Sequence, residues 1–502
     1  MSSYKEKKRK LQEEEEKKKE VTSVIVQFQT ADVGERKGPQ IDIPSNSTPA
    51  QLEELLNQLI ESEEPVPFAF YIGENEIAAS VGDTLREMVE SVVFSHSQNQ
   101  TTEGVTVIQY KPLSVYRVNP VTRCTDSIPG HTEAILHVSF SPDGTVLGTG
   151  GGDMTVRFWD VSSCTPIKTC TGHRNHVLCT AWSPTGRMYA SGDKNGEVII
   201  WNAKTGDMIS RLSGHRQWVT SLSWEPLHLN GKCDRLASSS RDGTVVVWNV
   251  ISRRKEMTIS GHSDSIECCK WSGENLIYTA SRDRTIRVWA LEGPNGKLVR
   301  TLVGHAHRIN ALSLNTDYVL RSGGFDWEKK SFASDEEMVE CAKKKYAEMK
   351  KSGPERLCSC SDDFTLFLWE PTSSKQPIAR LTGHQQLVNH IQFSPDGRYI
   401  ASASFDKKVK IWDGVTGKLL NTLHGHVGAV YQITWSPDSR FVASASKDST
   451  VKIWKPLGKK ALYTLSGHLD EVYGIDWSPF GTYVASGGKD RLVKIWSASS
   501  VS

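Results

Sequence analysis

Most of the chain alternates between short apolar segments and turns rich in glycine, proline and aspartate. Segments such as 156–159, 198–201 and 409–412 carry many β-branched side chains and end on tryptophan, which predicts β-strands. Between them lie turns such as Pro-Asp-Gly at 142–144, where proline favours the first turn position and glycine gives the backbone freedom. The pattern predicts a mainly β protein over about three-quarters of the chain.

Eight copies of one spacing divide this β-rich region. In each copy a Gly-His pair precedes a tryptophan, and an acidic or amide residue stands six positions before that tryptophan. Four short strands per repeat of ~40–45 residues with these landmarks are typical of the WD40 repeat family. We therefore expect an eight-bladed WD40 β-propeller over 115–499. The histidines are His131, His173, His215, His262, His305, His384, His426 and His468; the acidic or amide residues are Asp153, Asn195, Asp242, Asp283, Asp363, Asp406, Asp448 and Asp490.

The segment from Val115 to Ile128, before the first Gly-His pair, is expected to close the ring. Six residues follow Trp496, which is too short for another strand, and the early segment has no inner strands of its own. We assign it as the outer strand of the eighth blade. Such a strand would join the two ends of the array and leave no open sheet edge.

The fifth repeat contains an insertion at about 325–355, because 64 residues separate His305 from Trp369 instead of the 28 found in five of the eight repeats. A capping box at 334–337 precedes an apolar stripe that includes Val339, Ala342 and Tyr346, with acids leading and lysines trailing. This pattern predicts one helix. The helix is either a surface elaboration or a docking element, to which the lysines at 343–345 would contribute.

The first 112 residues form a separate region. Residues 1–20 are charged throughout and predict a disordered tail, in which Lys7 to Lys10 resemble a weak nuclear-localisation signal. Residues 21–112 show strands at 24–28 and 41–43, a capped helix with a leucine stripe from Leu52 to Leu59, and later strands at 68–72 and 105–110. This order predicts a small α+β domain with a ubiquitin-like fold.

Composition narrows the class of protein further. Sixty basic and fifty-eight acidic residues leave a net charge of +2, so contact with nucleic acid requires a local patch. No apolar run approaches the ~20 residues of a membrane span, and the first residues lack the apolar core of a signal peptide. We expect no membrane contact and ten free thiols in a reducing compartment. The chain has no C-x-x-C pair, so we expect no structural metal site.

Eight histidines and eight acidic or amide residues in one domain argue against catalysis, because an active site is needed once and these occur in every repeat. A buried histidine bonded to an aspartate in a tight turn satisfies polar groups in each blade. No separate Ser-His-Asp or Cys-His arrangement and no phosphate-binding loop are evident. We expect a protein that is not an enzyme and has no cofactor of its own.

The residue just before the repeated acid or amide is basic in five of the eight repeats, and this turn should project from one rim of the propeller. A rim of this kind would attract a phosphate backbone or an acidic protein, although solvated turn residues would show the same pattern. Trp218 and Arg308 follow Gly-His pairs near that rim and are typical interface anchors. The five basic residues are Lys194, Arg241, Arg282, Lys447 and Lys489.

Several segments resemble the Notchless family. They are Gln-Leu-Glu-Glu-Leu-Leu-Asn-Gln-Leu at 51–59, Pro-Val-Pro-Phe at 65–68, Val-Thr-Arg-Cys at 121–124, Ser-Trp-Glu-Pro at 223–226, Thr-Asp-Tyr at 316–318 and Ser-Asp-Asp-Phe-Thr at 361–365. The resemblance implies a monomeric assembly factor of the large (60S) ribosomal subunit precursor in the nucleus and nucleolus. It implies that the propeller docks on precursor proteins and rRNA. The ubiquitin-like domain would bind the metal-ion-dependent adhesion site (MIDAS) of the AAA ATPase midasin.

The resemblance also places a metal-contacting glutamate in the loop before the last ubiquitin-like strand, which here is Glu103. Mg²⁺ takes six oxygen ligands in octahedral order, so the partner's site would leave one position for this carboxylate. Glu74 and Glu76 lie in a competing hairpin loop. Two other functions remain open: a substrate receptor of a ubiquitin ligase, and an adaptor for the Notch receptor tail. Substrate receptors of ubiquitin ligases commonly carry arginine two positions after a Trp-Asp pair. In this chain Trp159-Asp160 and Trp412-Asp413 lack that arginine.

Overall fold

The computed structural model describes residues 23–30, 36–60, 68–73, 75–77, 80–82, 84–85, 105–112, 118–325, 332, 334–351 and 353–498. The chain divides into two compact units, Met1–Arg117 and Val118–Ser502, and each is described by itself. The tail expected at 1–20 lies outside the described residues.

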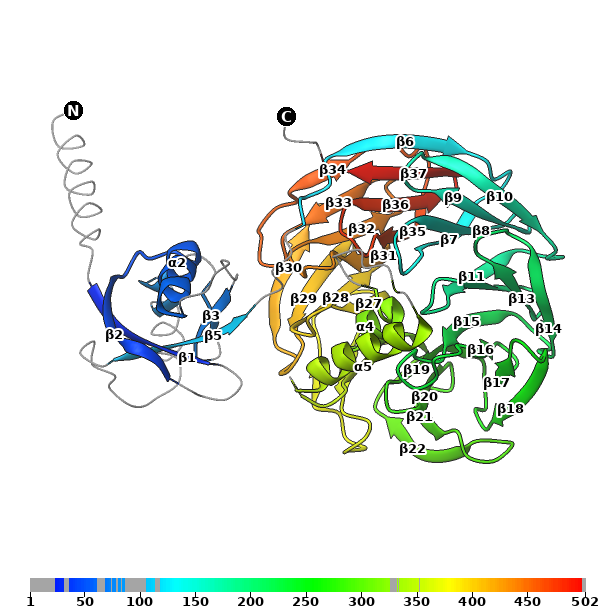
Figure 1. Cartoon of the computed structure of the whole chain (residues 1–502), viewed down its shortest axis with the longest axis horizontal. Helices are drawn as coiled ribbons and strands as arrows, with labels where there is room; N and C mark the ends of the chain where they lie inside the picture. Colours follow the sequence, from blue (N-terminus) through cyan, green and yellow to red (C-terminus); the bar gives the residue numbers. More distant parts are fainter. Residues whose placement is uncertain are drawn as a thin grey trace. The chain divides into compact units, whose positions relative to one another are not determined.

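The first unit contains a five-stranded mixed sheet and one helix (Figure 1). Its elements are β1 (Ser23–Thr30), β2 (Arg36–Pro44), α2 (Pro49–Ile60), β3 (Phe68–Ile72), β4 (Asn75–Glu76) and β5 (Thr106–Pro112). The strand order is β2-β1-β5-β3-β4, with β1 and β5 parallel and the other neighbours antiparallel. Leu52 and Leu56 of α2 are fully buried in one core with Phe28. The backbone N–H of Thr48 donates to Gln51 Oε1 at 2.9 Å and caps the helix as predicted.

The second unit is a β-propeller whose described residues form eight four-stranded antiparallel sheets around a ring (Figure 1). The first four sheets comprise β7 (Ile135–Phe140), β8 (Val146–Gly151), β9 (Thr155–Asp160) and β10 (Thr165–Thr171); β11 (Val177–Trp182), β12 (Met188–Asp193), β13 (Glu197–Asn202) and β14 (Met208–Ser213); β15 (Val219–Trp224), β16 (Arg235–Ser240), β17 (Thr244–Asn249) and β18 (Arg254–Ser260); and β19 (Ile266–Trp271), β20 (Leu276–Ser281), β21 (Thr285–Ala290) and β22 (Lys297–Val303). The other four comprise β23 (Ile309–Leu314), β24 (Leu357–Ser361), β25 (Leu366–Trp369) and β26 (Ala379–Leu381); β27 (Val388–Phe393), β28 (Tyr399–Ser404), β29 (Lys408–Asp413) and β30 (Leu419–His424); β31 (Val430–Trp435), β32 (Val442–Ser446), β33 (Val451–Trp454) and β34 (Tyr463–Leu465); and β35 (Val472–Trp477), β36 (Tyr483–Gly488), β37 (Leu492–Ser497) and β6 (Arg123–Pro129).

The hydrophobic core lies between neighbouring sheets. One buried cluster, for example, joins Val198 and Ile200 of the second sheet to Val246 and Trp248 of the third. Because each sheet packs against a neighbour on both faces, its strands are apolar on both sides, which explains the short continuous apolar runs of the sequence.

The eighth sheet joins the two ends of the second unit. β6 pairs antiparallel with β37, and Ile128 lies opposite Val493. The expected closure is therefore confirmed, although the strand begins at Arg123 and not at Val115. Before it, Val121 is fully buried and the backbone N–H of Val118 donates to Asp438 Oδ2 at 2.8 Å. These contacts hold the start of the second unit against the seventh sheet.

Between β23 and β24 the fifth repeat forms α5 (Asp335–Lys351), which confirms the predicted helix. It also forms α4 (Asp317–Ser322), which lies before the predicted start of the insertion and which the sequence pattern did not predict. Ser334 Oγ accepts the backbone N–H of Glu337 at 3.2 Å, as a capping box requires. Met338 and Ala342 of α5 are buried with Leu227 and Cys233 of the third repeat. Tyr346 stacks on His228, with ring centroids 4.1 Å apart.

α4 lies at a cavity of about 430 Å³ in the centre of the ring, which the innermost strands line. The Arg321 guanidinium forms an ion pair with Asp476 of β35 and donates to the carbonyl of Phe140 at 3.1 Å. The Tyr318 hydroxyl donates to the carbonyl of Pro479 at 3.2 Å. α4, which connects to the fifth sheet, is thus bonded across the ring to the first and eighth sheets, which are the sheets that meet at the closure.

Candidate interaction surface

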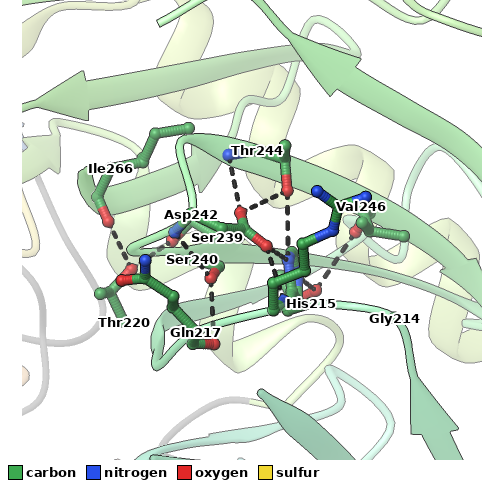
Figure 2. A network of polar contacts seen from close by, with 12 residues as sticks. Gly214, His215, Gln217, Thr220, Ser239, Ser240, Asp242, Thr244, Val246 and Ile266 are labelled. Carbon is green, nitrogen blue, oxygen red and sulfur yellow. Dashed lines mark hydrogen bonds and ion pairs between the residues drawn. The ribbon is translucent and has the colours of Figure 1, made fainter. Parts of the chain in front are cut away.

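A buried polar network links the repeated histidine, aspartate and tryptophan in every repeat. In the third repeat His215 Nε2 bonds to Ser238 Oγ at 2.7 Å, and its Nδ1 lies 3.4 Å from Asp242 (Figure 2). The Trp248 indole donates to the same serine oxygen at 2.7 Å. The hydroxyl and backbone N–H of Thr244 donate to Asp242. The network joins the Gly-His loop to the turn between β16 and β17.

The same arrangement occurs eight times in the described repeats. One assignment made from the sequence is wrong: in the second repeat His173 contacts Asp193 at 3.0 Å and not Asn195. Asp193 ends β12, so its carboxylate reaches the histidine from two residues earlier, while Asn195 accepts a bond from Asn175. The sequence reasoning also missed the hydroxyl ten residues before each tryptophan, which has the same period as the other landmarks. These are Thr149, Ser191, Ser238, Thr279, Ser359, Ser402, Ser444 and Ser486.

In the sixth repeat the protonation states of His384 and Asp406 suit a structural role. Burial alone would raise the pKa of Asp406, but the hydrogen bond and charge interaction with His384 outweigh it and bring the pKa to about 2. Burial lowers the pKa of His384, so a neutral imidazole faces a carboxylate at neutral pH. Both side chains are almost inaccessible to solvent. Each network therefore holds a turn in place and presents no reactive group to a substrate.

All eight residues that precede the repeated acid or amide lie on one rim. In every repeat the backbone N–H of this residue donates to the carbonyl of the residue three positions after the histidine, at 2.8 to 3.1 Å. This bond places the basic turn residue beside the loop that follows Gly-His. The donor and acceptor pairs are Gly152 and Ala134, Lys194 and His176, Arg241 and Trp218, Arg282 and Ser265, Asp362 and Arg308, Phe405 and Leu387, Lys447 and Ala429, and Lys489 and Glu471.

Four of the seven predicted rim residues face acids. Arg308 Nε lies 2.6 Å from Asp362, and Lys489 Nζ lies 3.3 Å from Asp470. Longer contacts of 3.8 Å and 4.0 Å join Lys447 to Glu471 and Arg282 to Asp264. The rim is consequently not uniformly positive, because these acids offset part of its charge.

Lys194, Trp218 and Arg241 come together at one point of the rim. The Lys194 ammonium lies 4.6 Å from the centre of the Trp218 ring, and the Arg241 guanidinium lies 4.8 Å from it. Trp218 is 37% exposed. Arg174 and Arg216, each directly after a repeated histidine, are exposed on the adjoining loops. We call Arg174, Lys194, Arg216, Trp218 and Arg241 the Trp218 patch.

A second feature of the same rim is a row of three aromatic rings. Phe405 and Tyr431 have ring centroids 5.7 Å apart, and Tyr431 and Tyr473 have centroids 5.5 Å apart. The Tyr431 hydroxyl donates to Glu471 at 2.9 Å. The row spans the sixth, seventh and eighth sheets, away from the Trp218 patch.

Two of the predicted metal-contacting candidates, Glu103 and Glu74, lie outside the described residues. Glu76 belongs to the short strand β4. The role of Glu103 therefore stays a prediction. Among the residues that the structure describes, no group of histidine, cysteine and acidic side chains could hold a metal ion, and no helix is long and apolar enough to cross a membrane. All ten cysteines are free.

Both units match known protein families. Residues 24–85 match the NLE (NUC135) domain. Seven segments between 122 and 497 match the WD domain, G-beta repeat, and the unmatched stretch holds the fifth repeat with its insertion. The chain is 46% identical over 384 residues to "Protein Notchless" of Drosophila melanogaster, covering 75% of this chain and 76% of that protein. The chain belongs to the Notchless family.

Other members of the Notchless family show similar agreement. "Notchless protein homolog" of Arabidopsis thaliana is 49% identical, with 77% of this chain and 79% of that protein covered. "Ribosome assembly protein 4" of Saccharomyces cerevisiae is 44% identical over 80% of both chains. The crystal structure of the computationally designed Ika8 protein superimposes with a TM-score of 0.59 at 24% identity, covers 75% of this chain and 99% of that one, and supports the fold alone. Like its WD40-repeat relatives, this Notchless-family chain is not an enzyme.

Proposed function

We propose that this chain is an assembly factor of the large (60S) ribosomal subunit precursor, acting in the nucleus and nucleolus. The observation that carries the proposal is the similarity to the yeast "Ribosome assembly protein 4", which covers 80% of both chains. A protein of the same name from Chaetomium thermophilum is 38% identical over 75% of this chain.

In this proposal the second unit is a closed eight-bladed propeller that attaches to the precursor particle. Its eight four-stranded sheets and the pairing of β6 with β37 support a closed ring. The first unit is a ubiquitin-like domain. The order β2-β1-β5-β3-β4, with parallel central strands and α2 packed on the sheet, supports this assignment.

The first unit offers Glu103 to the adhesion site of midasin, whose Mg²⁺ belongs to the partner. Glu103 stands in the loop just before β5, the central strand of the sheet, so the sheet would fix where the loop ends. A carboxylate is a hard oxygen ligand of the kind that Mg²⁺ prefers. ATP-driven movement of midasin would then pull on a factor that the propeller holds on the particle, and so remodel the particle and release the factor.

Replacing Glu103 by alanine should abolish Mg²⁺-dependent binding of the full-length chain to the adhesion-site domain of midasin. A glutamine there would keep an oxygen without the charge, and an aspartate would shorten the reach by one methylene, so we expect Glu103→Gln and Glu103→Asp to bind at least ~10-fold more weakly. Affinity would be measured by calorimetry with Mg²⁺ and with EDTA, using Glu74→Ala and Glu76→Ala as matched controls. Wild-type binding that ignores EDTA, or full affinity of Glu103→Ala, would contradict the metal bridge.

A further inference from the structure

We propose that the Trp218 patch binds the phosphate backbone of single-stranded RNA. The proposal deepens the proposed function, since the RNA of a precursor particle is the ligand it would meet there. It rests on three observations: an excess of positive charge in four adjoining loops, a tryptophan that gathers two of the charges, and the contrast with the opposite part of the same rim.

Four loops of the second and third repeats build the patch, at 172–176, 193–196, 214–218 and 240–243. They contain four basic side chains and two acids, Asp193 and Asp242. Both acids point at the buried histidines of their repeats and are 0% and 10% exposed. Among the described residues no acidic side chain forms an ion pair with Lys194 or Arg241, whereas Lys447 and Lys489 each do so. Glu133 of the first repeat lies 3.7 Å from His176 at the edge of these loops, and the charges of Lys194 and Arg241 are directed to solvent.

Trp218 brings two positive charges of the patch to one place. Lys194 comes from the turn between β12 and β13, and Arg241 comes from the turn between β16 and β17, yet both cations contact the one indole. A cation–π contact lowers the freedom of a long side chain while leaving its N–H donors available. Two charges from different sheets are thus gathered at one indole ring.

RNA fits these residues better than an acidic protein does. The Trp and Arg anchors of protein interfaces act in fully desolvated pockets, whereas Trp218 is 37% exposed and its contacts in the patch are charged. Phosphate recognition uses exposed Arg and Lys together with amide and backbone donors. Gln217, exposed on one of these loops, supplies such an amide. An aromatic ring among cations is also the combination that single-stranded nucleic acid binds.

The test measures binding of the full-length protein to a fluorescein-labelled RNA of about 12 nucleotides and mixed sequence, by fluorescence anisotropy between about 50 and 200 mM KCl. We expect the double variant Lys194→Ala, Arg241→Ala to bind at least ~10-fold more weakly at the low-salt end. Removing two phosphate contacts should also reduce the slope of log K against log salt by about 1.4, given about 0.7 per contact for a single strand.

The matched control is the double variant Lys447→Ala, Lys489→Ala, which removes the same charge from the same rim. Its affinity should change by less than about 2-fold, because those lysines already face acids. Trp218→Leu should weaken binding several-fold without changing any charge, and Trp218→Phe should restore most of it by offering an aromatic face again. Thermal unfolding curves would verify that every variant is folded.

Equal weakening by the two double variants would overturn the proposal, because binding would then follow net charge alone. Tighter binding to an oligoglutamate peptide of similar length than to the RNA would overturn it in favour of an acidic protein. The experiment distinguishes a failure of the RNA-binding patch from a failure of the proposed assembly role. A variant that loses the RNA yet still sediments with precursor particles contradicts the patch only, whereas wild-type protein that binds the RNA but never sediments with particles contradicts the assembly role only.

Discussion

Deleting residues 123–129 should unfold the eighth sheet and lower the stability of the whole ring. Without β6 the backbone of β37 becomes an open edge, Ile128 leaves the core, and the joining of the two ends of the ring is lost. A buried large-to-small change alone costs about 2–5 kcal/mol, and the lost strand pairing adds to it. Hydrogen exchange in β35 to β37 should accelerate at least ~100-fold, while α2 of the first unit keeps its protection.

A single substitution offers a milder form of the same test. Ile128→Ala truncates a buried side chain of β6 without shortening the chain, and such a change costs about 2–5 kcal/mol. The exposed Arg123→Ala serves as the control. Unchanged exchange in 472–496 after the deletion would show that β6 does not hold the ring closed.

Replacing Asp476 by alanine should destabilise the second unit by about 1–3 kcal/mol, the range for leaving a buried hydrogen-bonding group without its partner. The carboxylate of Asp476 pairs with Arg321 of α4 and accepts the backbone N–H of Phe140 at 2.8 Å. Alanine would leave both groups without this partner. Asp476→Asn keeps an acceptor for Phe140 and should cost less. Equilibrium unfolding in urea would give the free energies.

Two further variants separate this cross-ring contact from an ordinary ion pair. Adding Arg321→Met to Asp476→Ala should recover part of the stability, because no unpaired charge then remains. The exposed pair of Arg187 and Asp335, whose side chains are 62% and 60% accessible, serves as the matched control. Asp335→Ala should cost less than about 1 kcal/mol. Equal costs at Asp476 and Asp335 would contradict a bracing role for α4.

The repeated parts of the fold were predictable because the same chemistry recurs at a fixed period. Eight histidines with matching tryptophans located the sheets, and a segment before the first Gly-His pair, with no inner strands of its own, predicted the closing strand. The helix at 335–351 could be predicted because the capping residue, the apolar stripe and the order of acidic and basic residues all indicated a helix in the same segment. The fixed period also led to the one wrong partner. It points to Asn195 in the second repeat, whereas the residue that bonds to His173 is Asp193, two positions earlier.

The non-repeated parts depend on contacts between residues far apart in the chain. α4 has six residues and no apolar period, and it is held by Arg321, whose partner Asp476 lies 155 positions later. The division of the rim into paired and unpaired cations depends on acids from neighbouring loops, which the position of a lysine in its own repeat does not reveal. Glu103 was inferred from a family resemblance and remains a prediction.

The most direct measurement is sedimentation of the tagged chain in cell extracts, comparing the wild type with Glu103→Ala and with residues 1–117 alone. We expect the wild type to sediment with large-subunit precursors, residues 1–117 to stay at the top of the gradient, and precursors to accumulate with the Glu103→Ala chain still bound. A wild-type chain found only in light fractions, with a ubiquitin ligase or with the tail of a Notch receptor, would contradict the assembly role.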